Sequence, residues 1–156
     1  MNKKSGDRPG VKLICQNRKA RHEYEILDTF EAGLVLTGTE VKSLRDGRAS
    51  LGDAYAKIKD GELWFVNCHI SEYLAGNRYN HDPLRQRKLL MHRREIFKLN
   101  QKINERGLTL IPLSMYFVRG RAKVELALAK GKRVYDKRED IKKRDEKRAL
   151  DRLRRV

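Results

Sequence analysis

The sequence lacks several features that would place it in common classes of protein. No run of about 18 apolar residues occurs among its 156 residues, so we expect no membrane-spanning helix. The first residues, Met1–Lys4, are charged, but no apolar stretch follows them, so we do not expect a secretory signal. These absences favour a cytoplasmic protein that does not enter the membrane.

Residues that would support catalysis or metal binding are also few. Cys15 and Cys68 stand alone, and no Cys-x-x-Cys pair, His-x-x-x-His pair, Gly-x-Ser-x-Gly motif or phosphate-binding glycine loop occurs. Two isolated thiols suit a reducing compartment and argue against a zinc site or a disulfide scaffold. Cys68 fits a buried core position better than a nucleophile. We therefore expect no catalytic residue, metal or cofactor.

Positive charge is abundant, and it is concentrated at the two ends of the chain. The formal net charge is +16, from 37 Lys and Arg against 21 Asp and Glu. Residues 1–21 hold seven basic residues against one acid, and residues 130–156 hold thirteen against six. The middle, residues 22–129, is almost balanced, with seventeen against fourteen. Basic ends gain free energy by releasing counterions from a polyanion, which favours a nucleic-acid partner over a merely solvated surface.

Three segments are predicted from this distribution and from the apolar pattern. Residues 1–16 contain Gly6, Pro9 and Gly10 among basic residues and are predicted to be a mobile basic arm. Residues 17–129 are predicted to form the folded domain. Residues 130–156 are a basic tail whose apolar residues are too sparse to pack a helix onto that domain. We expect this tail to be disordered when free and helical on a partner.

The folded segment shows a mainly β pattern with added helices. Alternating residues predict strands from Glu23 to Leu36, with a bend or bulge, and from Ala122 to Leu128. The run from Leu108 to Val118 contains Pro112, so we predict a strand that is interrupted at an edge or a bulge. Asp60-Gly61 between two apolar runs predicts a hairpin.

Two helices are predicted beside these strands. Thr37-Gly38-Thr39-Glu40 has the Thr-x-x-Glu pattern of a capping box and predicts a short helix over about 39–46. Ile96, Leu99 and Ile103 recur with helical spacing before Gly107. Short strands with two helices favour a small closed antiparallel barrel with the helices outside.

Two segments combine cations with planar rings, a combination that binds RNA through phosphates and unpaired bases. The first is Asn17–His22, which supplies Arg18, Lys19, Arg21 and His22. The second runs from Tyr73 to Lys88 and interleaves rings with cations: Tyr73, Arg78, Tyr79, His81, Arg85, Arg87 and Lys88. A charged loop with half-buried tyrosines is an equally good interpretation of the second segment.

The strings that carry this pattern resemble the small protein B (SmpB) family, whose members bind transfer-messenger RNA in bacteria. The resemblance extends from about residue 11 to the C-terminus, and its matching strings are highly specific together. They are Asn17–Tyr24, Phe30–Leu34, Gly38–Arg45, Arg87–Leu90, Ala129–Lys132 and Tyr135–Arg138.

The resemblance implies a barrel of oligonucleotide-binding (OB) type and a part in trans-translation. Its members hold the tRNA-like domain of transfer-messenger RNA and help deliver it to stalled ribosomes. Asn17, Glu31 and Leu90 match family positions that grip this RNA. We expect the free protein to be a monomer.

The resemblance also implies that the tail contacts the decoding centre of the small ribosomal subunit and the empty messenger channel. Many relatives carry histidine where Tyr135 stands, and tyrosine keeps a planar ring but does not become a cation near neutral pH. The tail residues concerned are Gly131, Lys132, Arg133, Tyr135, Asp136, Lys137 and Arg138.

Two other functions stay open at this point. The first is a ribosome-assembly protein that binds ribosomal RNA, which the same basic segments would serve. The second is a small RNA-processing hydrolase, which would need clustered carboxylates or a histidine pair that the sequence does not display.

Overall fold

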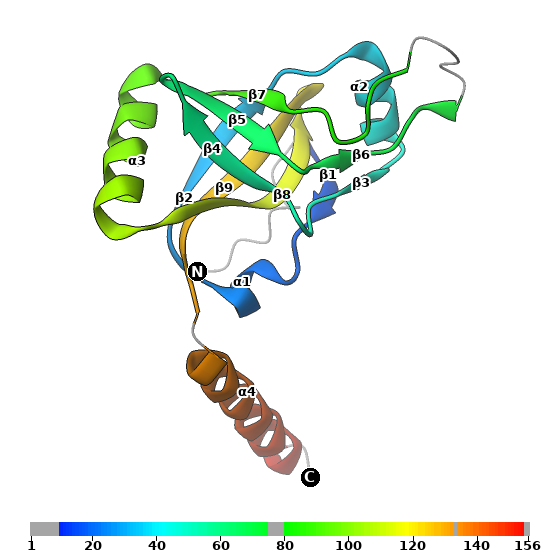
Figure 1. Ribbon diagram of the computed structural model, residues 1–156. Coiled ribbons are helices and arrows are strands. Elements are labelled where there is room, and N and C mark those ends of the chain that lie inside the picture. Colours follow the sequence, from blue (N-terminus) through cyan, green and yellow to red (C-terminus); the bar gives the residue numbers. More distant parts are fainter. Residues whose placement is uncertain (1–9, 75–79, 133, 155–156) are drawn as a thin grey trace.

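The computed structural model describes residues 10–74, 80–132 and 134–154, and the folded part of the chain is built around an antiparallel β-sheet. Helices surround the sheet, and the C-terminal helix extends away from it (Figure 1). The elements in chain order are β1 (Val11–Gln16), α1 (Ala20–Glu23), β2 (Tyr24–Leu34), α2 (Gly38–Arg45), β3 (Ala49–Ser50), β4 (Tyr55–Lys59), β5 (Glu62–Val66), β6 (His69–Ile70), β7 (Arg87–Leu90), α3 (Arg93–Arg106), β8 (Thr109–Val118), β9 (Arg121–Gly131) and α4 (Val134–Arg154).

The strands of the main sheet follow the order β1-β8-β4-β5-β7-β2-β9, and β8 also pairs with β9. Their pairings are antiparallel, and β3 and β6 form a second, two-stranded sheet. Side chains that point to one side of the main sheet form the hydrophobic core, which includes Phe65, Met115, Val124 and Leu126. The prediction of a mainly β fold with added helices is therefore confirmed.

The hairpin between β4 and β5 forms where Asp60-Gly61 predicted it. Asp60 and Gly61 have φ angles of 53° and 74°, so both adopt the left-handed conformation that a two-residue hairpin turn requires. The strands on either side pair from Lys59 opposite Glu62 to Tyr55 opposite Val66. Glycine has no Cβ and Asp tolerates this conformation, so the sequence fixes the turn locally.

Both helices predicted for the folded segment are present. At α2 the backbone N–H of Thr37 donates to Glu40 Oε1 at 2.9 Å, as expected for a capping box. Helix α3 buries Ile96 and Leu99 and ends at Gly107, whose φ of 63° suits a glycine cap. It begins three residues before Ile96 because His92 takes the extended N-cap position.

The sequence around Pro112 predicted a strand at a sheet edge or a strand with a bulge, and β8 shows which of the two is present. It pairs with β1, β4 and β9, so it is not an edge strand. Between Pro112, which lies opposite Leu126, and Ser114, which lies opposite Glu125, one extra residue forms a β-bulge. The prediction of a bulge at Pro112 is confirmed, and the extra residue is Leu113.

The boundary of the N-terminal arm at residue 16 is wrong. Val11–Gln16 form β1, which pairs with β8 from Val11 opposite Val118 to Gln16 opposite Ser114. Leu13, Ile14 and Cys15 are consecutive apolar residues without a polar alternation, so the segment did not suggest a strand, and pairing with the apolar β8 stabilises it. Residues 1–9 of the predicted arm lie outside the described residues.

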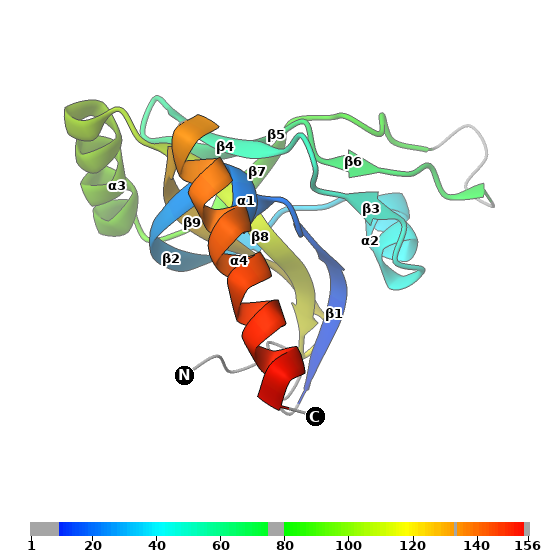
Figure 2. The same ribbon diagram turned by 90° about the horizontal axis from the view of Figure 1, so that it is seen from below.

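The C-terminal boundary also differs, since β9 continues two residues past Ala129 to Gly131. Helix α4 follows, and its side chains from Ile141 to Arg154 are exposed. Seen from below, α4 lies in front of α1 (Figure 2). Arg144 donates to His22 Nδ1 at 3.0 Å, which joins the two helices. Among the described residues, no helix is long and apolar enough to cross a bilayer.

Candidate nucleic-acid interface

One surface of the main sheet faces away from the core and gathers polar side chains. Side chains opposite each other on antiparallel strands point to the same side. Glu31 on β2 lies opposite Glu125 on β9, and Glu125 lies opposite Ser114 on β8. We call this surface the outer face and define it by Glu31, Leu90, Ser114, Tyr116, Lys123 and Glu125.

The two carboxylates of the outer face are each held by a hydroxyl group. The phenol of Tyr116 donates to Glu31 Oε2 at 2.5 Å. Ser114 Oγ donates to Glu125 Oε2 at 3.4 Å. In the part of the chain that the structure describes, no ion pair includes either carboxylate. The outer face therefore offers two carboxylate acceptors that hydroxyl groups hold.

Leu90 adds an exposed apolar side chain to this face. It lies on β7 opposite Gly33, two residues from Glu31 along β2, and is 54% exposed. A Cβ at Gly33 would stand 3.3 Å from the Leu90 Cβ, so the glycine leaves room for the leucine. The structure thus brings the predicted residues Glu31 and Leu90 onto one surface.

Asn17 attaches the basic segment to the bulge in β8. Its backbone N–H donates to the Leu113 carbonyl at 2.8 Å, and its side-chain Nδ2 donates to the Pro112 carbonyl at 3.0 Å. A bulge interrupts the ladder and turns carbonyls away from the neighbouring strand. Asn17 therefore positions the residues that follow it.

Those residues form α1 and the turn before it, and they place cations at the edge of the outer face. Arg18, Lys19 and Arg21 are exposed, and His22 is half-buried. A pocket of about 220 Å³ lies between this segment and the sheet. Its lining combines cations with hydrogen-bonding groups: Gln16, Asn17, Arg18, Arg21, Ser114 and Glu125, together with Leu113.

Arg87, predicted as an RNA contact, is not on this surface. Its side chain is completely buried and its Nε donates to Glu40. Its Nη1 donates to the Cys68 carbonyl at 2.7 Å. Residues 87 and 89 of β7 point inward while 88 and 90 point outward, because a strand alternates. The prediction that Arg87 contacts a ligand directly is therefore wrong for this structure.

Glu40 is the centre of a buried polar network beneath the loop that precedes β7. Arg85 Nη2 donates to Glu40 Oε1 at 2.5 Å, in addition to the bonds from Thr37 and Arg87. Burial alone would raise the pKa of the Glu40 carboxyl, but the hydrogen bonds from Arg85, Thr37 and Arg87 together lower it. The network therefore keeps a charged carboxylate inside the protein.

His81 belongs to the same region and is also buried. Its Nε2 donates to the Ile70 carbonyl at 2.9 Å, so its Nδ1 accepts from the Thr39 hydroxyl, also at 2.9 Å. Its ring is therefore used inside the protein and not for stacking. The Lys42 ammonium lies over the ring of Tyr73, with its Nζ 5.5 Å from the centre of the ring. Arg78 and Tyr79 lie outside the described residues.

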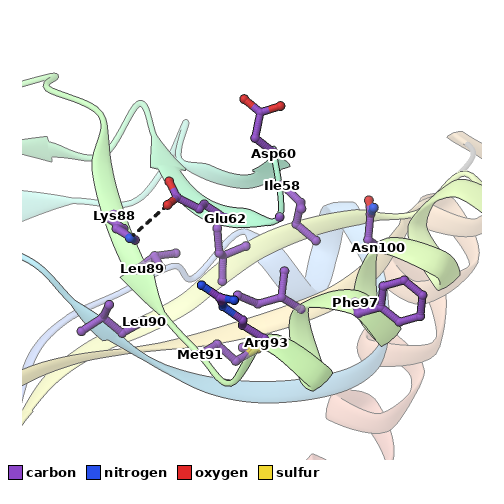
Figure 3. Close-up of a pocket in the computed structure, with 13 residues that line it drawn as sticks. Ile58, Asp60, Glu62, Lys88, Leu89, Leu90, Met91, Arg93, Phe97 and Asn100 are labelled. Atoms are coloured by element: carbon purple, nitrogen blue, oxygen red, sulfur yellow. Dashed lines mark hydrogen bonds and ion pairs between the residues drawn. The ribbon is translucent and has the colours of Figure 1, made fainter.

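Lys88 points outward and donates to Glu62 at 3.3 Å. The two residues lie at the edge of a pocket of about 490 Å³ between the β4–β5 hairpin, β7 and α3 (Figure 3). Leu90 and the 63%-exposed Phe97 also line this pocket. The exposed apolar surface at Leu90 therefore continues through this pocket to Phe97 on α3.

The predicted tail residues begin where β9 ends. Gly131 pairs with Tyr24, and Lys132 donates from its backbone N–H to the Glu23 carbonyl and from Nζ to the Arg21 carbonyl. Arg133 lies outside the described residues. Tyr135, Asp136 and Lys137 lie in the N-terminal turns of α4, and Arg138 is exposed. The start of the tail is therefore joined to α1.

Neither thiol is placed as a nucleophile. Burial raises the pKa of Cys68 to about 12 and that of Cys15 to about 11. Cys68 Sγ lies 3.9 Å from Met115 Sδ in the core. Among the described residues, no three His, Cys, Asp or Glu side chains are grouped as metal ligands.

Sequence reasoning missed Glu125, Ser114 and Tyr116. Each was interpreted only as a member of a strand, since the residue opposite it depends on the strand register. The signal that was available is the polar position of Glu125 within an alternating strand, which marks the side that faces solvent.

Comparison with known proteins supports one family along most of the chain. The model of the "SmpB protein" family matches residues 14–156. An "SsrA-binding protein" of Desulforudis audaxviator is 64% identical over 92% of this chain and 94% of its own length. Another, from Thermobifida fusca, is 63% identical over 96% of this chain and 94% of its own length.

A solved structure agrees with these relatives. It is described as "tmRNA-SmpB: a journey to the center of the bacterial ribosome", and one of its chains is similar to this one with a TM-score of 0.66. The two chains are 50% identical, and the match covers 80% of this chain and 86% of the other. On the family match and these identities, the chain belongs to the SmpB protein family.

Proposed function

We propose that this protein is the RNA-binding adaptor of trans-translation. It binds the tRNA-like domain of transfer-messenger RNA and delivers it to stalled ribosomes for rescue and peptide tagging. The observation that carries this proposal is the family match over residues 14–156, with relatives named SsrA-binding protein and a similar chain in a tmRNA-SmpB structure. A protein that acts by binding needs no catalytic centre, and we propose that it works in the cytoplasm without one.

The proposed RNA-binding surface is the outer face together with α1 and the turn before it. Exposed cations hold phosphates, the Glu31 carboxylate accepts from base or ribose donors, and Leu90 packs against a base or sugar. Asn17 positions the basic segment, and Arg87 supports the surface from inside. The proposed contacts are Arg18, Lys19, Arg21, His22, Glu31, Lys88 and Leu90.

We further propose that the main sheet is a closed barrel of OB type. Support comes from the pairings, since β8 pairs with both β4 and β9, and the series β8-β4-β5-β7-β2-β9 returns to its start. A closed sheet of this size places its binding residues on an outer surface and leaves few exposed edges.

The tail is proposed to act on the ribosome, at the decoding centre and in the messenger channel. We propose that residues after Lys132 lose their helix in the free protein and regain it there. A helix whose described side chains are all exposed from Ile141 to Arg154 has little tertiary packing to stabilise it.

The test measures binding of the purified protein to the tRNA-like domain and to a ribosomal RNA duplex of equal length, at several salt concentrations. We expect tight binding to the first RNA only. The logarithm of the affinity should fall linearly with the logarithm of the salt concentration. Each neutralised phosphate contributes about 0.7–0.9 to the slope, and we expect a total slope of only a few units. Equal affinity for both RNAs would contradict the proposal.

A variant test identifies the surface. Glu31→Ala should weaken binding to the tRNA-like domain and leave binding to the duplex unchanged, since a carboxylate repels phosphates and gains only from specific donors. Glu105→Ala on α3, an exposed glutamate away from the outer face, is the matched control. Sequencing of RNA recovered with the protein from cells separates this function from ribosome assembly.

A further inference from the structure

The 220 Å³ pocket beside α1 contains a group that simple phosphate binding does not explain. Arg18 and Arg21 supply cations, but Glu125 lines the same pocket. Within the described residues this carboxylate has no ion-pair partner, and Ser114 is its hydrogen-bond donor at 3.4 Å. Its negative charge reduces the attraction of the pocket for phosphate, and its oxygens can accept from a partner that donates hydrogen bonds.

The position of Glu125 also has a cost in the free protein. It lies directly opposite Glu31 in the β2–β9 pairing, and like charges at opposite positions destabilise a sheet. The hydroxyls of Tyr116 and Ser114 reduce this cost but do not neutralise either charge. Replacement of Glu125 by a neutral residue would remove the repulsion, so folding alone does not require this glutamate.

The chemistry of the bases restricts what a carboxylate can bind in this pocket. Guanine alone presents two adjacent donors, N1–H and the N2 amino group, on its Watson–Crick edge. On the same edge, adenine and cytosine each place an acceptor beside their donor, and uracil places one on either side, which a carboxylate repels. The volume is below the roughly 300–1,000 Å³ of pockets that enclose a drug-sized ligand, so it suits one base.

We propose that this pocket binds one unpaired guanine and that Glu125 accepts from its N1–H and N2 amino groups. Ser114 orients the carboxylate from the sheet side, and Arg18 and Arg21 hold the phosphates on either side of the base. This inference rests on the proposed RNA-binding function and names Glu125 as a specificity-determining residue of that site. The proposed RNA-binding site then contains two carboxylates that recognise RNA, Glu31 and Glu125.

The test is a double-mutant cycle between protein and RNA. Each unpaired guanine of a synthetic tRNA-like domain is replaced in turn by inosine, which keeps N1–H and lacks the N2 amino group. For the unaltered protein, one such replacement should weaken binding about tenfold, within the range for a bidentate contact to a base. With Glu125→Gln the starting affinity should be lower, and the same replacement should change it less than twofold.

Controls separate this contact from a general loss of structure or charge. Glu105→Gln on α3 removes an exposed carboxylate elsewhere and should keep the full response to inosine. Glu125→Gln should unfold at the same temperature as the unaltered protein or a higher one, because the repulsion from Glu31 is removed. A fall in affinity that accompanies a fall in thermal stability would assign Glu125 to the fold and overturn the proposal.

The remaining outcomes distinguish the two levels of inference. If the unaltered protein does not bind the tRNA-like domain, the proposed function fails. If it binds tightly, but no single inosine has a greater effect on the unaltered protein than on Glu125→Gln, the guanine pocket is wrong and the function stands.

Discussion

The guanidinium of Arg87 donates to the carboxylate of Glu40 although neither side chain is exposed to solvent. Glu40 caps α2, and Arg87 begins the strand that carries Leu90. The pair therefore connects the start of α2 to the strand that carries Leu90 on the outer face.

Loss of Arg87 should destabilise the fold strongly. Arg87→Met leaves the buried Glu40 carboxylate with the bonds from Thr37 and with the partly exposed Arg85 as its cation, and removal of one partner of a buried pair costs about 3–5 kcal/mol. Urea unfolding measures this loss. Arg85→Met should cost less, and a Glu40→Leu/Arg87→Met double variant should recover part of the stability. Equal losses for both single variants would contradict the assigned roles.

Stability should decrease in acid partly through Glu40. Its pKa is lower in the folded protein than in the unfolded chain, so its contribution is complete above the unfolded value of about 4.5 and is lost as pH falls through the folded value. We expect the unaltered protein to lose more unfolding free energy than Glu40→Gln between about pH 5 and pH 3. Parallel pH profiles of the two proteins would exclude this contribution.

Removal of the tail should separate two activities. A chain that ends at Lys132 keeps all of β9 and the bond from Lys132 to Glu23. Its melting temperature and its affinity for the tRNA-like domain should therefore stay close to those of the full chain, because α4 buries little apolar surface. Tagging on stalled ribosomes should stop. A chain that ends at Ala129 should be less stable, and this difference checks the boundary.

Tyr135 should matter through its ring. Tyr135→Ala is expected to reduce tagging several-fold, whereas Tyr135→Phe keeps a planar ring and should be mild. Single-turnover tagging on ribosomes stalled without messenger measures the effect, and affinity for the free RNA should not change. If Tyr135→Ala tags at the normal rate, the basic residues of the tail become the better candidates.

The two thiols should resist alkylation in the folded protein. Only the thiolate reacts, and burial raises the pKa of Cys15 to about 11 and that of Cys68 to about 12. At about pH 8, iodoacetamide should modify both at least tenfold more slowly in buffer than in urea. Mass spectrometry of each peptide follows the reaction. Rapid modification of Cys68 without urea would show that its surroundings open.

Local chemistry made part of the fold predictable. The Asp60-Gly61 turn, the Thr37–Glu40 capping box and the Gly107 cap depend on a few adjacent residues, so their sequences were sufficient. Strand β1 depends on β8, which lies about a hundred positions away in the chain, and its own short apolar run does not alternate, so it could not be predicted.

Some residues of the candidate site could likewise be predicted from the sequence, and others could not. The cations of the Asn17–His22 segment could be predicted from composition, and the resemblance pointed to Glu31 and Leu90. The error at Arg87 arose because the segment before β7 has an irregular pattern, so its alternation was not recognised and an inward-facing arginine was grouped with exposed ones. Glu125 could not be selected before the pairing of β2 with β9 was known.

The extra residue in β8 reverses which positions of that strand face outward. Before the bulge, Ile111 and Leu113 pack on the side of α1, and after it Met115 and Phe117 turn into the main core. Deletion of Leu113 would leave Pro112 opposite Leu126 and Ser114 opposite Glu125, so the rest of the strand would keep its two sides. The deletion would instead remove a buried leucine from the side of α1, together with the carbonyl that accepts from the Asn17 backbone. The extra residue thus contributes its side chain and its carbonyl to the α1 side of the sheet, whereas the pairing of the strand on either side of it does not depend on it.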